Sequence, residues 1–117
     1  MDGFVINIEE ATLNNIYYRR VIDTTDNQQL VLMSIPIGED IPMETHPYTT
    51  QFIRFEAGEA DVILNGKTYK VKDGVSVTIH PGTEHQIINS SLYENLKLYT
   101  IYSPPEHPRD TIQMYKP

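Results

Sequence analysis

The sequence contains no cysteine, and only 9 of its 117 residues are basic, against 16 acidic ones. Without cysteine, neither disulfide bonds nor thiolate metal sites are available. No apolar run approaches the roughly 20 residues that a membrane-spanning helix needs. The N-terminal segment carries early acidic residues and no basic stretch, unlike a secretory signal peptide. We therefore expect a soluble, cytoplasmic protein with no membrane partner.

The shortage of positive charge bears on possible partners. The formal net charge is −7, and Arg19-Arg20 is the only adjacent pair of basic residues. Because affinity for nucleic acids rests largely on cationic side chains that displace counterions from phosphates, no nucleic-acid partner is expected. The chain also lacks a Gly-x-Ser-x-Gly motif, so covalent catalysis has no evident nucleophile.

Short apolar or alternating segments, separated by turns, run through the whole chain. They are typical of β-strands and cover residues 16–24, 30–37, 49–55, 61–64, 67–71, 75–79, 85–89 and 96–102. A further short strand is expected at 4–11, the tail at 111–117 either folds back as a short strand or trails along the surface, and no segment has the pattern of a helix. About seven to nine such strands predict an all-β sandwich or barrel, and the length fits one domain over residues 1–117.

Turn residues separate these segments. Asn65-Gly66 lies between two strands and predicts a type I′ hairpin, since both residue types accept positive φ angles. Residues 38–47 carry two prolines and are predicted to begin as a loop. Residues 103–110 contain three prolines that break regular pairing, and a lid role for His107 within them is an alternative that the sequence does not favour.

Polar side chains fall at positions compatible with the interior of the predicted sandwich. Glu44 and His46 are two residues apart, so on an extended chain they point the same way. Gln51 follows across a proline-containing turn, and His85 opens the strand at 85–89. A buried histidine, carboxylate or amide destabilises the fold by a few kcal/mol if it lacks a partner, and one metal ion would satisfy all four groups.

Two of these residues have alternative roles. Glu44 is either a metal ligand or a carboxylate that orients an imidazole, and if it binds no metal it is the best candidate for a general base. Gln51 either binds the metal through its amide oxygen or hydrogen-bonds a neighbouring histidine or ligand. Carboxylate, amide and imidazole ligands suit a divalent transition metal such as Mn, Fe, Ni, Co or Zn.

The two stretches that carry these residues resemble the paired motifs of the cupin superfamily. The first motif corresponds to Gly38, Glu44, His46, Gln51 and Gly58, and the second to Gly74, His80, Pro81, Gly82, His85 and Asn89. The spacing is kept throughout a motif core at 38–89, and the resemblance covers about residues 30–102. It implies an antiparallel double-stranded β-helix, or jelly-roll barrel. The ending TIYSPPEHP is similar to a subgroup of small single-domain cupins with sugar-isomerase-like names.

The chain departs from the usual cupin ligand set of three histidines and one glutamate. Glu44 stands in place of the first histidine, and Gln51 stands in place of the glutamate. Only His46 and His85 match the pattern in identity. Some uronate-processing cupins are similar in keeping a glutamine at the position of Gln51, but this transfers no substrate.

The resemblance implies three functions from different classes. The first is a metal-dependent isomerase for a small sugar or sugar acid, in which the metal grips substrate oxygens while Glu44 moves a proton. The second is an iron dioxygenase, which needs two histidines and the Glu44 carboxylate around the metal. The third is a non-catalytic module that binds a small molecule.

Further residues are candidates for lining a ligand pocket, and the resemblance also implies an assembly. The pocket candidates are Phe52, Glu56, Tyr99 and Tyr102, although alternation puts Phe52 and Glu56 on the strand face opposite Gln51. Small cupins often pair, so a homodimer is expected, with residues 1–24 or 103–117 covering an open sheet edge.

Overall fold

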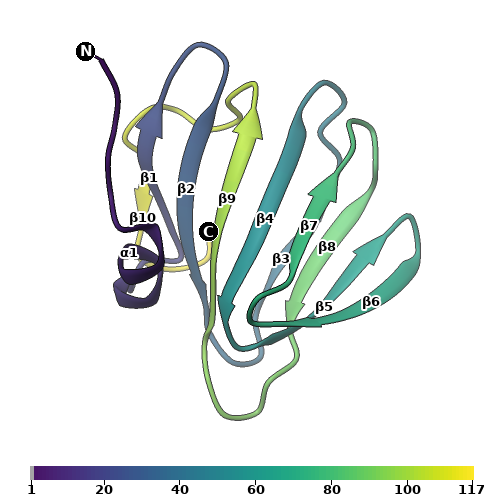
Figure 1. Cartoon of the computed structure of the whole chain (residues 1–117). Coiled ribbons are helices and arrows are strands. Elements are labelled where there is room, and N and C mark those ends of the chain that lie inside the picture. Colours follow the sequence, from purple (N-terminus) through teal and green to yellow (C-terminus); the bar gives the residue numbers. More distant parts are fainter. Residues whose placement is uncertain (1) are drawn as a thin grey trace.

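Antiparallel strands in two facing sheets make up most of the computed structural model, which describes residues 2–117 (Figure 1). The strands are β1 (Arg19–Thr24), β2 (Gln29–Ile35), β3 (Asp40–Glu44), β4 (Thr50–Ala57), β5 (Glu59–Leu64), β6 (Lys67–Lys72), β7 (Ser76–Ile79), β8 (His85–Asn89), β9 (Leu96–Ser103) and β10 (Ile112–Gln113). One helix, α1 (Ile8–Asn14), packs against β2, β4 and β9.

The strand order confirms the predicted jelly roll. One sheet has the order β10-β1-β2-β9-β4-β7, and the other has the order β3-β8-β5-β6. From β2 onward the chain passes repeatedly between the two sheets, so strands close in sequence face each other across the interior (Figure 1). The start of β4, the end of β9 and the start of β8 therefore meet at one end of the enclosed space.

The core consists of the inward-facing side chains of strands whose buried and exposed residues alternate, and it fills the space between the two sheets. Along β4, Gln51, Ile53 and Phe55 are buried, whereas the residues between them are partly exposed. The residues of β2 are buried almost without interruption, as its apolar composition predicts for a strand covered on both faces. Burial of each large apolar side chain stabilises the fold by roughly 1.5–3 kcal/mol.

Two glycines hold backbone shapes that fix strand pairing. Asn65 and Gly66 have φ angles of 47° and 81°, which confirms the type I′ hairpin between β5 and β6. Gly58, between β4 and β5, has a φ of 93°, and a Cβ atom there would lie 3.0 Å from the Asn95 carbonyl oxygen. Both the positive φ and the close approach of β9 require glycine at position 58.

The structure corrects the strand predicted over residues 4–11. Residues 8–14 form α1, whose N-cap Asn7 accepts a hydrogen bond from the Glu10 N–H at 3.1 Å. Glu9 and Glu10 lie in the first turn, where negative charge favours a helix. The combination of an asparagine cap with a glutamate three residues later was the signal that the alternating apolar residues obscured.

The segment predicted to begin as a loop contains strand β3. It pairs with β8 through Asp40 to Ile88 and Ile41 to Ile87, and the register shifts before Glu44 pairs with His85. Because β3 lies at the edge of its sheet, Pro42 removes no hydrogen bond that a neighbouring strand needs.

The tail forms the second short element that the sequence left open. Ile112 and Gln113 in β10 pair with Arg20 and Arg19 at the edge of the larger sheet. The expected homodimer stays a prediction. Both segments expected to contribute to it expose apolar surface, including Val5 in the N-terminal arm and Tyr115 in the tail.

Candidate metal centre

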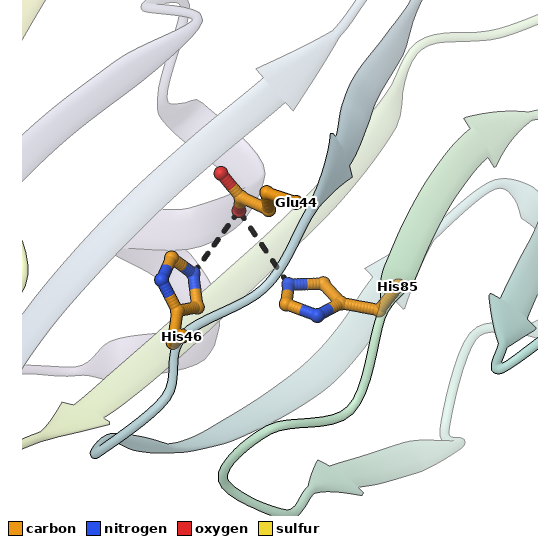
Figure 2. A group of neighbouring side chains, drawn as sticks. All are labelled: Glu44, His46 and His85. Carbon is orange, nitrogen blue, oxygen red and sulfur yellow. Dashed lines mark hydrogen bonds and ion pairs between the residues drawn. The ribbon is translucent and has the colours of Figure 1, made fainter.

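Glu44, His46 and His85 meet at one end of the space between the sheets (Figure 2). Glu44 ends β3, His46 follows it in the connecting loop, and His85 opens β8. One ligand atom from each residue lies within 4.8 Å of the others, as a shared metal ion requires. The sequence predicted these three residues for one site, and the structure brings them together.

Local backbone contacts set the positions of the two histidines. The register shift in the β3–β8 pairing brings Glu44 opposite His85. The loop that carries His46 is tied to the turn before β8, because the Gly82 N–H donates to the His46 carbonyl at 2.9 Å. The motif glycine at position 82, with a φ of 84°, therefore links the two halves of the site.

The His85 imidazole is fully buried and fixed in one orientation. Its Nδ1 lies 2.9 Å from the Thr83 carbonyl oxygen, which only accepts hydrogen bonds, so Nδ1 carries the proton. In a neutral ring, Nε2 then presents a lone pair. This buried Nε2 has no hydrogen-bond partner and faces Glu44 Oε1 at 3.5 Å. A lone pair opposite a carboxylate is unfavourable without a cation between them.

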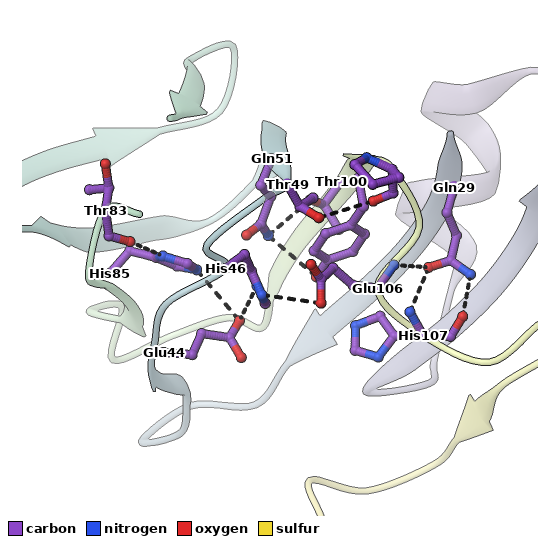
Figure 3. A network of polar contacts seen from close by, with 12 residues as sticks. Gln29, Glu44, His46, Thr49, Gln51, Thr83, His85, Thr100, Glu106 and His107 are labelled. Carbon is purple, nitrogen blue, oxygen red and sulfur yellow. Dashed lines mark hydrogen bonds and ion pairs between the residues drawn. The ribbon is translucent and has the colours of Figure 1, made fainter. Parts of the chain in front are cut away.

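Gln51 supplies a second buried acceptor from the opposite sheet. Its amide Nε2 contacts the hydroxyls of Thr100 at 3.1 Å and of Tyr102 at 3.3 Å (Figure 3). Its Oε1 is buried and has no partner. His85 and Gln51 thus each carry a buried acceptor that lacks a partner. Together with the Glu44 carboxylate, these acceptors suit a divalent metal ion, which would remove the free-energy cost of leaving them unpaired.

The Glu44 carboxylate is ionised. Burial by itself would raise the pKa of Glu44, but the hydrogen bond from His46 Nε2 at 3.2 Å lowers that pKa below its ordinary value of 4.5. In turn, the hydrogen bond to Glu44 raises the pKa of His46. The proton on His46 Nε2 therefore occupies a place where a metal ion would compete with it.

Glu106 is a site residue that the sequence did not reveal. Its Oε2 lies 3.4 Å from Nδ1 of His46, the ring nitrogen that points away from Glu44. A carboxylate on the far nitrogen of a metal-binding histidine fixes the ring and raises its basicity. Glu106 lies in a proline-rich segment with no periodic pattern, so only the folded chain shows that it reaches His46.

The fully buried Gln29 of β2 holds the segment that carries Glu106. Its Oε1 accepts hydrogen bonds from the N–H groups of Glu106 at 3.3 Å and His107 at 3.0 Å. Its Nε2 donates to the His107 carbonyl at 2.8 Å (Figure 3). The same atom contacts the Thr24 hydroxyl at 3.2 Å. The side-chain amide thus acts as a latch that fixes the backbone of residues 106–107 over the end of the barrel.

Tyr102 is the one pocket candidate beside the cluster. Its ring is buried and meets the His46 ring edge-on, with centroids 5.7 Å apart. Burial raises the pKa of Tyr102, so the phenol stays neutral. Phe52 and Tyr99 lie together on the other face of their strands, 6.4 Å between centroids, and Glu56 pairs there with Arg54 at 2.8 Å.

These features define a class: a small jelly-roll protein with a cluster of two histidines and one glutamate that could hold a metal ion. The chain belongs to the cupin family, since the model for the cupin domain matches residues 31–102. Among residues 2–117, no helix has the length and apolar character that a membrane span requires.

Three proteins are similar to this chain over most of its length. The uncharacterized protein L612 of Acanthamoeba polyphaga mimivirus is 52% identical over 97% of this chain and 73% of its own length. The uncharacterized protein YrkC of Bacillus subtilis (strain 168) is 39% identical over 97% of this chain and 63% of its own length, so this chain spans less than two thirds of that relative. The crystal structure of BH2720 from Bacillus halodurans is similar with a TM-score of 0.93 and 40% identity, covering 96% of this chain and 89% of that one.

Proposed function

We propose that this cupin holds a divalent transition metal (Mn, Fe, Ni, Co or Zn) and acts enzymatically on a small oxygenated substrate. Glu44, His46 and His85 would hold the metal, and the orphaned Oε1 of Gln51 would complete the set. The observation that carries the proposal is the pair of buried acceptors without partners, on His85 and Gln51, beside an ionised carboxylate. When bound, such a metal acts as a Lewis acid that polarises a substrate carbonyl or hydroxyl oxygen.

The chain's own residues supply the remaining functions. Glu106 holds the His46 ring from behind, and Gln29 holds Glu106. Tyr102, against His46, offers a neutral hydroxyl in a buried environment. An isomerisation of a sugar or sugar acid also needs a group that moves a proton. Glu44 fills this role only if it leaves the metal, and Glu106 is then the other carboxylate beside His46.

An iron-dependent dioxygenase is the second candidate. It is favoured by the composition of the cluster, because two histidines and one carboxylate are the set found in non-haem iron oxygenases that leave metal positions open. In this alternative Glu44 stays bound to the metal, and the amide of Gln51 keeps its hydrogen bonds to the hydroxyls of Thr100 and Tyr102. Oxygen uptake by the Fe(II)-loaded protein with a panel of small hydroxy compounds separates it from the isomerase.

Both candidate functions require a bound transition-metal ion, and the metal content of the protein tests this requirement. Protein purified without a histidine tag is expected to contain close to one transition-metal ion per chain by elemental mass spectrometry. The double variant His46→Ala/His85→Ala is expected to lose it, whereas His80→Ala, an exposed histidine in the neighbouring turn, is the matched control that keeps it. Absence of metal after incubation with each of the five ions would contradict the proposal.

A variant then separates catalysis from simple binding. Glu44→His restores the histidine that cupins usually carry at this position and is expected to raise metal affinity. Activity that falls in this variant while metal is retained supports an enzymatic role for the carboxylate. A gain in metal affinity with no turnover by either protein at any metal would favour a non-catalytic binding module.

A further inference from the structure

Residues 104–109, which we call the strap, lie in the connection from β9 to β10 and carry two side chains to the candidate metal centre (Figure 3). The Oε2 atom of Glu106 lies 3.4 Å from Nδ1 of His46. The His107 ring packs edge-on against the Tyr102 ring, with centroids 5.2 Å apart, and Tyr102 meets the His46 ring at 5.7 Å. The strap therefore reaches the same candidate ligand, His46, by two routes.

Side chains from the body of the fold hold the strap in place of a neighbouring strand. Three of its six residues are prolines, which lack the N–H group that a strand ladder needs. The Gln29 amide accepts hydrogen bonds from the N–H groups of Glu106 and His107 and donates to the His107 carbonyl. At the start of the strap, the Thr49 hydroxyl donates to the Pro104 carbonyl at 3.3 Å. Gln29 thus supplies most of the hydrogen bonds that position the two residues facing the site.

The two motif histidines differ in what fixes their rings. His85 is held by the Thr83 carbonyl, which belongs to its own turn. Within residues 2–117, the two ring nitrogens of His46 contact only carboxylates, Glu44 on Nε2 at 3.2 Å and Glu106 on Nδ1 at 3.4 Å. One of these carboxylates is a candidate metal ligand, so the other alone orients the ring from outside the ligand set. The direction in which His46 presents Nε2 therefore depends on the docked strap.

We propose that the strap is a positioning element of the metal centre: Gln29 and Glu106 orient His46, so that binding of a divalent transition metal and docking of the strap stabilise each other. The part of this inference that concerns the metal rests on the proposed function, whereas the link between the strap and His46 does not. Because coupling between two equilibria is reciprocal, the metal holds the strap down by the same factor by which the docked strap raises metal affinity. Gln29 thereby acts on the metal through the strap.

A double-mutant cycle tests whether Gln29 acts through Glu106. Competition with a fluorescent chelator measures the Zn²⁺ affinity of Gln29→Met, of Glu106→Ala and of the double variant. We expect Gln29→Met to weaken binding about 10-fold in the native background and less than about 2-fold in the Glu106→Ala background, where the contact is already lost. Asn89→Leu, which removes a paired buried amide at the other end of the space between the sheets, is the control and should leave affinity unchanged. Equal weakening in both backgrounds, or a folded Gln29→Met variant that binds as tightly as the native protein, would overturn the proposal.

Hydrogen exchange measures strap docking in the native protein and covers the case in which Gln29→Met does not fold. The N–H groups of Glu106 and His107 exchange when the strap opens locally, and we expect Zn²⁺ to slow this exchange about 10-fold, by the reciprocal of its own gain in affinity. The Ser91 N–H, which the side-chain oxygen of Asn89 holds in the same way at 2.9 Å, is the matched control and should not change. Unchanged exchange of the two strap groups in protein that binds Zn²⁺ contradicts the coupling.

A further variant separates failure of the coupling from failure of the metal proposal. His46→Ala removes the partner of Glu106 whether or not a metal binds. In metal-free protein, exchange of the Glu106 and His107 N–H groups should accelerate about 2- to 5-fold, the effect of a partly exposed ion pair, and His80→Ala in the exposed turn should leave it unchanged. Faster exchange in a protein that binds no metal supports the link between the strap and His46 while the metal proposal fails. Unchanged exchange in His46→Ala contradicts the inference even if metal content is stoichiometric.

Discussion

The two ends of the space between the sheets are built from the same strands but serve different purposes. Along β4 the inward row runs from Gln51 to Ile53 and Phe55, with exposed fractions of 1%, 0% and 0%. Burial is thus equal at the two ends. At the Phe55 end it is matched by apolar packing, whereas at the Gln51 end it leaves an amide oxygen without a partner.

Asn89 shows that the unsatisfied groups are not a general property of this interior. It lies on β8, inward like His85, at the opposite end of that strand. Its amide donates to the carbonyls of Ile35 at 2.9 Å and Glu94 at 3.1 Å, and its oxygen accepts from the Ser91 N–H at 2.9 Å. Where a buried polar side chain serves structure, all its groups are paired. On β8 the unpaired buried atom is Nε2 of His85, at the end that carries the candidate site.

The largest expected effect comes from damage to the apolar end. Phe55→Ala removes a fully buried ring and is expected to lower the free energy of unfolding by about 3–5 kcal/mol, because the cavity cannot collapse fully. Metal content per folded chain should not change. Urea denaturation and elemental analysis of the same preparation measure the two quantities. A loss of metal without a loss of stability would contradict the separation of the two ends.

A second pair of variants compares buried amides directly. Asn89→Leu leaves two carbonyls and one N–H group without partners, so we expect a loss of about 1–3 kcal/mol in unfolding free energy. Gln51→Leu removes an oxygen that has no partner, together with the amide contacts to the hydroxyls of Thr100 and Tyr102, so the metal-free protein should lose less unfolding free energy than Asn89→Leu does. Equal destabilisation in metal-free protein would show that the Gln51 oxygen is satisfied in solution.

The contacts behind His46 are expected to have a smaller effect on stability and a measurable one on metal binding. Glu106→Gln should weaken metal affinity about 10- to 100-fold, as is usual for carboxylates that orient a metal-binding histidine. Glu56→Gln, which alters a carboxylate on the outer face, is the control and should leave affinity unchanged. Competition with a fluorescent chelator measures both. If Glu106→Gln binds as tightly as the native protein, Glu106 does not orient the ring.

The pH dependence of metal binding gives the smallest and most specific effect. The raised pKa of His46 means that a proton stays on the ring at higher pH than the ordinary value of 6.5 allows. Because the metal displaces this proton, affinity should begin to fall as the pH drops toward 6.5 from above, and it should continue to fall below that. Glu106→Gln should shift this fall to lower pH, and Ile53→Val, at the apolar end, should not. Titrations at a series of pH values give the midpoint.

The sequence predicted much of this molecule because its signals are local. Alternation located most strands, Asn65-Gly66 located the hairpin, and the motif spacing brought Glu44, His46 and His85 to one place. Strand β3 was missed because proline is normally incompatible with a ladder, yet an edge strand tolerates it.

The remaining features depend on contacts between distant parts of the chain. Gln29 and the backbone of residues 106–107 are more than 70 positions apart and meet only after β2 and β9 pair. Neither the glutamine nor the sequence around residues 106–107 indicates that these two segments will be hydrogen-bonded to each other.

The protonation state of the His85 ring tests the central claim most directly, since the claim is that this buried ring presents an unprotonated nitrogen to a cation. Long-range ¹H–¹⁵N spectra of the metal-free and Zn²⁺-loaded protein report it. We predict that Nδ1 is protonated in both states, that Nε2 is unprotonated without metal, and that Zn²⁺ shifts the Nε2 resonance. A proton on Nε2 of the metal-free ring with Nδ1 bare, or a spectrum that Zn²⁺ leaves unchanged, would contradict the account.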